Sequence, residues 1–392
     1  MISVEEAQAR LLALAAPLPA FSVPIVQAVG HYLAENVIAK RSQPAADLSA
    51  MDGYAIRFAD MPGPWRMIGE SAAGRPFAGQ INPGEAARIF TGAQVPDGAD
   101  SVLIQEEASR DGDVLTLSGE GPPASGVHIR RMGGDFTDGD RLLEAGSKLN
   151  AGAVAAAVMA GHGTLAVGGR PKVSIIASGD ELLPPGQSCG TAQIPSSNSV
   201  MLTAMLANLP CHVQDEGIVA DNLPDLEAAF SACAGSDIIV TSGGASVGDH
   251  DLVQQALRNV GAEIDFWKVA MRPGKPVMAG RLGAAIVLGL PGNPSSAFVT
   301  GFLFLLPLVR HFAGSTSPLL EPFTAILDSD LHAGGQRTDY FRARAEHGII
   351  SVFNRQDSGM LAPLSKANAL LINPAGAPAR SAGSAAQYLR ID

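Results

Sequence analysis

Three carboxylates follow predicted strands in the region from residue 173 to residue 311. Glu181 lies in Ser178-Gly179-Asp180-Glu181-Leu182, directly after an apolar run at 173–177. Asp221 follows a second run at 213–219, and Asp251 closes a glycine-rich turn after a third run at 237–240. Carboxylate oxygens are the ligands that Mg²⁺ prefers in proteins. Glu181, Asp221 and Asp251 are therefore the predicted metal ligands, with a role in orienting an attacking water.

The glycine-rich turn at 241–251 is the predicted anion site. Glycines allow positive φ and close backbone approach, and the start of the following helix offers unpaired N–H groups. The turn is expected to hold a phosphate or another oxyanion through Ser242, Gly243, Gly244, Ser246 and Gly248. Taken alone, the turn fits equally well with acids that only cap the helix and complement its dipole.

Three cations lie within eight residues, at Lys268, Arg272 and Lys275. A cationic cluster that faces carboxylates is the arrangement expected for a site that binds Mg²⁺ and a phosphorylated ligand. The carboxylates would hold the metal, and the cations would bind the phosphate oxygens or a second oxyanion. Each residue also has a purely structural interpretation, as a helix-start acid, a solvated cation or a Pro-Gly turn. The recurrence of polar groups after successive strands favours a site.

The elements that must position these residues alternate between strands and helices. Strands are predicted at 173–177, 213–219, 238–240, 264–269 and 285–290, and helices at 197–208, 223–232, 251–260 and 294–312. This alternation predicts a mostly parallel, doubly wound sheet with helices on both faces. Ligands bind such sheets at the carboxyl ends of the strands, where the loops meet.

The rest of the chain divides by pattern into an α/β multidomain protein. A capping box at Ser3–Glu6 starts a first helix, and a second is expected at 25–34. Short alternating runs at 87–90, 101–104 and 114–117, separated by Gly and Pro turns, predict an all-β module. The expected domains are a helical linker or dimer domain (1–41 with 139–170, including a helix at 151–160), an inserted β module (42–138), the α/β domain (171–315) and a C-terminal β-barrel-like domain (316–392).

Composition narrows the function classes. The 392 residues carry 27 Lys and Arg against 38 Asp and Glu, a net charge of −11, and only 5% are aromatic, which argues against broad nucleic-acid binding. No secretory pattern opens the chain, and the apolar run at 297–308 is too short to cross a bilayer, so we expect a cytoplasmic protein. The three cysteines lack metal-ligand spacing. The sequence contains no GxxxxGK[ST] motif and no well-placed GxGxxG motif, which argues against an ordinary nucleotide-binding enzyme.

Six short strings resemble those of the molybdopterin molybdenumtransferase family, which includes MoeA and the gephyrin E domain. They run in family order: SAMDGYA (49–55), FTGA (90–93), SGDEL (178–182), SGGASVGDHD (242–251), RPGKP (272–276) and LPGNP (290–294). The resemblance covers nearly the whole chain. It implies a four-part protomer in an elongated homodimer, and insertion of molybdate into adenylylated molybdopterin with Mg²⁺-dependent release of AMP.

The resemblance also carries residue roles to this chain. It places Glu181, Asp221 and Asp251 at the acidic positions, Lys268, Arg272 and Lys275 in the cationic cluster, and Pro291 and Pro294 beside the molybdate pocket. Asp52, Thr91 and Asp135 match positions that reach the cleft from the partner subunit, and Ser358 and Arg342 match weaker positions in the terminal domain. Without the resemblance, Asp52 in an Asp-Gly pair would be a tight turn. Arg272 stands where many relatives have lysine, so charge is kept but a planar fork replaces a point charge.

Two other functions remain open at this point. One is a molybdopterin adenylyltransferase, which needs only the central domain. The other is a non-catalytic molybdopterin-binding scaffold or carrier, against which the retained acids and cations argue. The resemblance further implies contacts with a molybdopterin adenylyltransferase and with molybdoenzyme chaperones.

Overall fold

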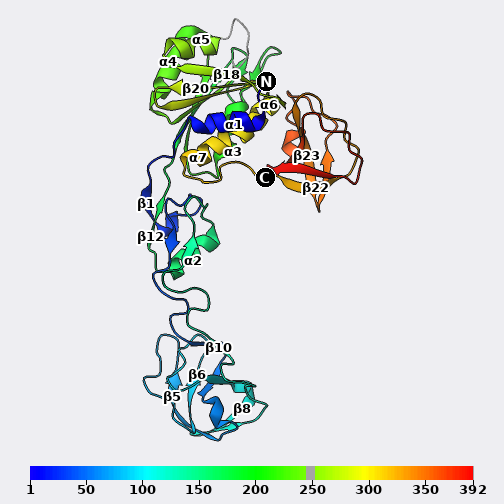
Figure 1. Ribbon diagram of the computed structural model, residues 1–392. Helices are drawn as coiled ribbons and strands as arrows, with labels where there is room; N and C mark the ends of the chain where they lie inside the picture. Colours follow the sequence, from blue (N-terminus) through cyan, green and yellow to red (C-terminus); the bar gives the residue numbers. More distant parts are fainter. Residues whose placement is uncertain (244–251, 392) are drawn as a thin grey trace.

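The computed structural model describes residues 1–243 and 252–391. The molecule is elongated (Figure 1). The α/β domain and the C-terminal barrel lie side by side at one end, the domain with β1, β12 and α2 forms the middle, and the inserted β module occupies the far end. The multidomain α/β class expected from the sequence is confirmed.

The central sheet has six strands in the order β16-β13-β17-β21-β20-β18. Its four parallel strands are β13 (Lys172–Ser178), β16 (His212–Val219), β17 (Ile238–Ser242) and β21 (Ala285–Leu290). β20 (Pro276–Leu282) and β18 (Glu263–Lys268) extend it by antiparallel pairing. The sheet is thus mostly parallel, as expected, but β20 is not among the strands predicted from the sequence. Its residues follow the Pro-Gly turn directly and form a hairpin with β21 across a short turn.

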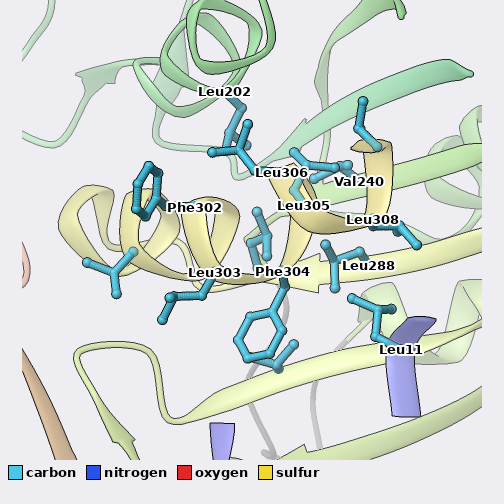
Figure 2. Packing of buried hydrophobic residues seen from close by; sticks show 14 of the residues in the cluster. Leu11, Leu202, Val240, Leu288, Phe302, Leu303, Phe304, Leu305, Leu306 and Leu308 are labelled. Atoms are coloured by element: carbon cyan, nitrogen blue, oxygen red, sulfur yellow. The ribbon is translucent and has the colours of Figure 1, made fainter. Parts of the chain in front are cut away.

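Helices cover both faces of this sheet, as predicted. One face packs against α4 (Leu223–Ala232) and α5 (Leu252–Asn259). The other packs against α1 (Val4–Ala13), α3 (Asn198–Leu206) and the closing helix, which is made of α6 (Pro294–Thr300), a π-helical segment η5 (Gly301–Leu305) and α7 (Leu306–Phe312). Figure 2 shows the closing helix directing Leu305 and Leu308 toward Val240 and Leu288 of the sheet. It is the central element of the largest core.

Pro307 follows the π segment in the closing helix. A proline has no N–H, so Leu303, four residues earlier, loses the helical hydrogen bond to its carbonyl oxygen. The buried side chain of Gln8 in α1 replaces that bond, because its Nε2 donates to the Leu303 oxygen at 2.8 Å. α1 therefore belongs with the α/β core, although the sequence analysis groups it with residues 139–170.

Within residues 1–243 and 252–391, one helix, Pro294–Phe312, is long and apolar enough to cross a membrane. Its 19 residues exceed the run at 297–308, so the length of that run does not by itself exclude a span. The helix is 83% buried over its most apolar window, which is the behaviour of a core helix.

The middle domain has one α-helix, α2 (Ala151–Met159), capped by Asn150. Strand pairs β1 (Phe21–Pro24) with β12 (Thr164–Val167), and β2 (Val37–Ile38) with β11 (Arg141–Leu143), form the rest. The second helix predicted at 25–34 is wrong: only a single 3₁₀ turn, η1 (Ile25–Gln27), forms there. Gly30 adopts φ +87°, which ends the turn, and Tyr32 and Leu33 then bridge to other strands.

Two backbone segments meet where the middle domain joins the α/β domain. Gly168 approaches the end of α7 so closely that a Cβ placed on it would lie 2.0 Å from the Ala313 carbonyl oxygen. Nearby, the Leu18 N–H donates to the Phe312 carbonyl oxygen at 2.8 Å. We call this contact between Gly168 and Ala313 the glycine joint.

The β module and the terminal domain are built from strands, as predicted. The module has a six-stranded sheet in the order β7-β4-β6-β5-β9-β8 and a pair of β3 with β10. Its strands are β3 (Leu48–Ser49), β4 (Gly53–Ile56), β5 (Trp65–Ser71), β6 (Glu85–Ile89), β7 (Ser101–Ile104), β8 (Ala108–Asp111), β9 (Val114–Leu117) and β10 (Ile129–Arg130).

The terminal domain closes into a five-stranded barrel, because β23 pairs with both β24 and β25. The barrel strands are β22 (Phe323–Leu327), β23 (Thr338–Glu346), β24 (Ile349–Val352), β25 (Ala369–Asn373) and β26 (Ala385–Arg390). The short β19 (Met271–Arg272) of the α/β domain adds to β23, which ties the two domains together.

Candidate functional site

Carboxylates predicted at the sheet edge lie close together at the ends of β13 and β16. Asp221, two residues after the end of β16 at Val219, donates its backbone N–H to Asp180 Oδ1 at 3.0 Å. Burial raises the pKa of the Asp221 carboxyl, and the charges of Asp180 and Glu181 raise it further. A hydrogen bond with Ser178 opposes this shift. Three carboxylates thus repel one another at the ends of β13 and β16, which is the environment that a cation relieves.

A cavity of about 360 Å³ adjoins Glu181. Its walls come from the ends of β13, β17 and β21 and from the starts of α3 and α6. The lining residues are Ala177, Ser178, Glu181, Leu182, Ile194, Pro195, Ser196, Ser197, Asn198, Ser242, Gly243, Pro291, Gly292, Asn293 and Pro294. The prediction that loops at the carboxyl ends of parallel strands converge is confirmed for these segments.

The glycine-rich turn begins inside this cavity wall. Ser242 is buried at the end of β17, and Gly243 adopts φ +105°. A Cβ on Gly243 would lie 2.7 Å from the Ser178 carbonyl oxygen, so only glycine allows this approach. The other predicted residues of the turn, Gly244, Ser246, Gly248 and Asp251, lie outside the described residues.

A loop of the C-terminal barrel meets the cavity at Ser358. The Asn293 Nδ2 donates to Ser358 Oγ at 3.2 Å, and the Ser295 N–H donates to the Ser358 carbonyl oxygen at 2.9 Å. Pro291 and Pro294 flank Asn293 in the same wall. Ser358 thus contacts Asn293 of the cavity wall without itself lining the cavity, and its predicted contribution to ligand binding stays a prediction.

Arg342 is placed differently from Ser358. Its side chain is fully buried in the barrel, where Nη2 donates to the carbonyl oxygens of Arg355 at 3.4 Å and Asp357 at 3.1 Å. Desolvation lowers the pKa of its guanidinium, which the nearby Asp357 partly offsets. In this structure Arg342 supports the loop that carries Ser358 and does not line the cavity.

The cationic cluster lies toward the other end of the same edge. β18 runs parallel to β21, so Lys268 at its end shares the edge with Ser178 and Ser242. Lys268, Arg272 and Lys275 are exposed, and the Arg272 Nε lies 3.1 Å from Asp339 Oδ1 of the barrel. Since β16 and β13 stand at one side of the sheet and β20 and β18 at the other, acids and cations occupy opposite ends of one edge.

Asp52, Thr91 and Asp135 are not brought to this site within the protomer. Asp52 precedes β4 and Thr91 follows β6 in the β module, which lies at the far end of the molecule (Figure 1). Asp135 lies in the connection to the middle domain, where its N–H donates to the Gln43 carbonyl oxygen and the next residue, Phe136, packs against Ala39 and Ala160. Asp52 is nevertheless organised, because Oδ1 accepts the Thr91 N–H at 2.7 Å and the Thr91 hydroxyl at 2.8 Å. These hydrogen bonds lower the pKa of the Asp52 carboxyl.

No group of three or more His, Cys, Asp or Glu side chains is arranged to hold a metal ion in the part of the chain that the structure describes. Of the predicted ligands, Glu181 and Asp221 lie close to each other, and Asp251 falls outside that part. The donor chemistry of the described pair, two carboxylates beside a third at Asp180, suits a hard divalent cation.

Asn198 is a residue of the site that sequence reasoning missed. It opens α3, lines the cavity, and its Nδ2 donates both to Ser242 Oγ at 2.8 Å and to the Gly292 carbonyl oxygen at 2.7 Å. In the sequence, Ser196-Ser197-Asn198 reads as an ordinary start of a helix. Nothing in its spacing indicates contacts 44 and 94 residues away.

Three family models together match most of the chain. They are the MoeA N-terminal region (domain I and II) at residues 2–161, a probable molybdopterin binding domain at 174–311, and the MoeA C-terminal region (domain IV) at 324–391.

Whole-chain relatives agree with these models. A protein of Haemophilus influenzae named molybdopterin molybdenumtransferase is 33% identical over 382 residues, covering 95% of this chain and 94% of the relative. One of the same name from a Nostoc species is 34% identical, covering 94% and 88%. The crystal structure of a molybdopterin biosynthesis moeA protein from Pyrococcus horikoshii superposes with a TM-score of 0.85 at 25% identity, covering all of both chains. The chain therefore belongs to the molybdopterin molybdenumtransferase (MoeA) family, a family of transferases in molybdenum cofactor biosynthesis.

Proposed function

We propose that this protein inserts molybdate into adenylylated molybdopterin and releases AMP in a Mg²⁺-dependent reaction, as a homodimer in the cytoplasm. The observation that carries the proposal is the pairing of a cavity of about 360 Å³ with a carboxylate cluster at Asp180, Glu181 and Asp221. This pairing supports proposed substrate, metal and phosphate sites at one edge of the sheet.

The acidic end is the proposed metal site. Glu181 and Asp221, with Asp251, would hold Mg²⁺ and orient a water toward the adenylate. When bound, Mg²⁺ supplies positive charge that stabilises the phosphate oxygens during hydrolysis. The raised pKa of Asp221 supports this assignment, because a carboxylate destabilised by its neighbours gains most from a cation.

The remaining groups are proposed to bind the anions. Ser242 and Gly243, with Gly244, Ser246 and Gly248, would hold phosphate oxygens through the turn and the helix start. Lys268, Arg272 and Lys275, together with Pro291, Pro294 and Ser358, would receive the molybdate end. Arg342 would act by supporting the loop of Ser358.

The homodimer accounts for the distant β module. The β module that carries Asp52 and Thr91 lies at the opposite end of the molecule from the α/β domain (Figure 1), and Asp135 lies in the connection to that module. Their proposed roles therefore require the module of a second copy. Exposed apolar side chains of the middle domain offer a surface for dimerisation. They are Val26 in η1, Val29 just after it, and Val158 and Met159 in α2.

The test is AMP release from adenylylated molybdopterin by purified protein, with and without Mg²⁺ and molybdate. Release should require both, and Glu181→Gln should lower its rate about a hundredfold or more, since a metal ligand contributes several kcal/mol to the barrier. Glu321→Gln, which removes an exposed carboxylate outside the site, is the matched control. Release that is independent of Mg²⁺, or equal in Glu181→Gln and the control, would refute the proposal.

A further inference from the structure

Asn198 joins three chain segments that are distant in the sequence. Its amide nitrogen donates one proton to Ser242 Oγ, at the end of β17, and the other to the Gly292 carbonyl oxygen, in the loop between β21 and α6. Both acceptors line the cavity. One side chain on α3 thus connects the start of the glycine-rich turn with the Pro291–Pro294 loop.

The orientation of this amide follows from its partners. A backbone carbonyl only accepts hydrogen bonds, so the NH₂ group must face Gly292 and both of its protons are used. The Oδ1 atom is then turned away into the protein, where it is buried without a hydrogen-bond partner. A substitution that keeps the shape but removes the protons cannot reproduce the contact.

Asn198 adds to a direct pairing of the two strands. β17 and β21 pair in parallel as far as Ser242, which lies opposite Leu290. Beyond that pair, the Gly243 N–H donates to the Leu290 carbonyl oxygen at 3.3 Å, which is long for a backbone hydrogen bond. On the opposite side, Asn293 and Ser295 attach the same loop to Ser358 of the barrel. Without Asn198, the Pro291–Pro294 loop would be held from the barrel side, and the strand pair with this long hydrogen bond would connect it to Ser242 and Gly243.

We infer that Asn198 is a positioning residue, which sets the separation between Ser242 at the end of β17 and the Pro291–Pro294 loop, and so the span between the two ends of the bound substrate. The inference rests on the proposed function, in which the turn binds phosphate and the loop borders molybdate. Asn198 acts through Ser242 and Gly292 and needs no contact with the substrate of its own.

Two variants separate positioning from charge. Asn198→Asp keeps the shape but directs a carboxylate oxygen at the Gly292 carbonyl, and Asn198→Ser removes the reach without adding charge. Both should lower kcat/KM for AMP release about tenfold to a hundredfold, the size of effect expected from small misplacement of reacting groups. If only the Asp variant is impaired, repulsion explains the effect and the inference is wrong.

Asn368→Asp is the matched control for stability. Asn368 also connects two segments with its amide, donating to the Ala345 carbonyl oxygen at 3.0 Å and accepting the Ala345 N–H at 2.8 Å, but it does so in the barrel. It should lower the melting temperature without changing KM. If the Asn198 variants also change only the melting temperature, their role is merely structural and the inference fails.

Hydrogen exchange provides a readout that does not depend on activity. Peptides covering 238–243 and 286–293 should exchange faster in both Asn198 variants than in wild type, and unchanged in Asn368→Asp. If wild-type protein releases no AMP, the proposed function fails, whereas the exchange comparison still decides whether Asn198 holds the two segments. Unchanged exchange in both Asn198 variants would overturn the inference.

Discussion

Removal of the Gln8 amide should destabilise the α/β domain more than its small size suggests. Pro307 deprives the Leu303 carbonyl of its helical donor, and Gln8 Nε2 supplies the replacement at 2.8 Å in the buried interface of α1 with the closing helix. Gln8→Leu fills similar space but leaves that oxygen buried and unpaired. Such a loss costs about 1–3 kcal/mol.

The expected shift is large enough to measure by urea unfolding. With a slope of about 2 kcal/mol/M, a loss of 1–3 kcal/mol moves the transition midpoint down by roughly 0.5–1.5 M. Circular dichroism at 222 nm follows the helices directly. Gln255→Leu, an exposed position on α5, is the control and should stay within about 0.5 kcal/mol of wild type.

A second substitution tests the cause. Pro307→Ala restores an N–H that can reach the Leu303 oxygen, so it should be less destabilising, or even stabilising, in the Gln8→Leu background than in wild type. Strict additivity of the two changes would refute the explanation, because residues that share one acceptor must couple.

Two further predictions follow from the site and from the glycine joint. Asp221→Asn should raise the melting temperature near neutral pH in the absence of metal. The pKa of Asp221 is raised in the folded state, so the ionised carboxylate destabilises the fold above that pKa. This destabilisation disappears below the pKa of the unfolded state, about 4. The gain should therefore be absent at pH 3, and Mg²⁺ should stabilise wild type but not the variant; a gain that persists at pH 3 would contradict this account. Gly168→Ala should lower the free energy of unfolding by about 1–3 kcal/mol, because its Cβ would lie 2.0 Å from the Ala313 carbonyl oxygen. Gly163 has open space around it, so Gly163→Ala should destabilise the protein much less. Equal effects of the two alanines would show that the joint relaxes freely.

The positions of the acids could be predicted because they depend on a local rule. Alternation of strand and helix fixes a parallel sheet, and its loops must meet at the carboxyl ends, which brings Glu181, Asp221 and Ser242 together. The antiparallel strand β20 was not predicted. It directly follows the Pro-Gly turn, and its assignment depends on a hairpin with β21. The helix expected at 25–34 had suitable apolar spacing, but Gly30 and long-range bridges of Tyr32 and Leu33 overrode it.

The roles of Asn198 and Gln8 could not be predicted from the sequence, for a different reason. Each donates a hydrogen bond to a backbone carbonyl oxygen far away in the sequence. Every residue has such a carbonyl, so the residue type does not identify the acceptor. The roles of Asp52, Thr91 and Asp135 are likewise invisible within one chain. They rest on the resemblance and, as proposed, on a second copy of the chain.

The glycine joint has a mechanical consequence for the proposed homodimer. The β module lies at the far end of the elongated chain from the α/β domain (Figure 1), whereas Gly168 and Ala313 meet close to the α/β domain. A small rotation at this joint would displace the distant module much more than the joint itself. In the proposed dimer, the stiffness of these two backbone segments would therefore determine how accurately Asp52 is placed in the cleft of the second copy.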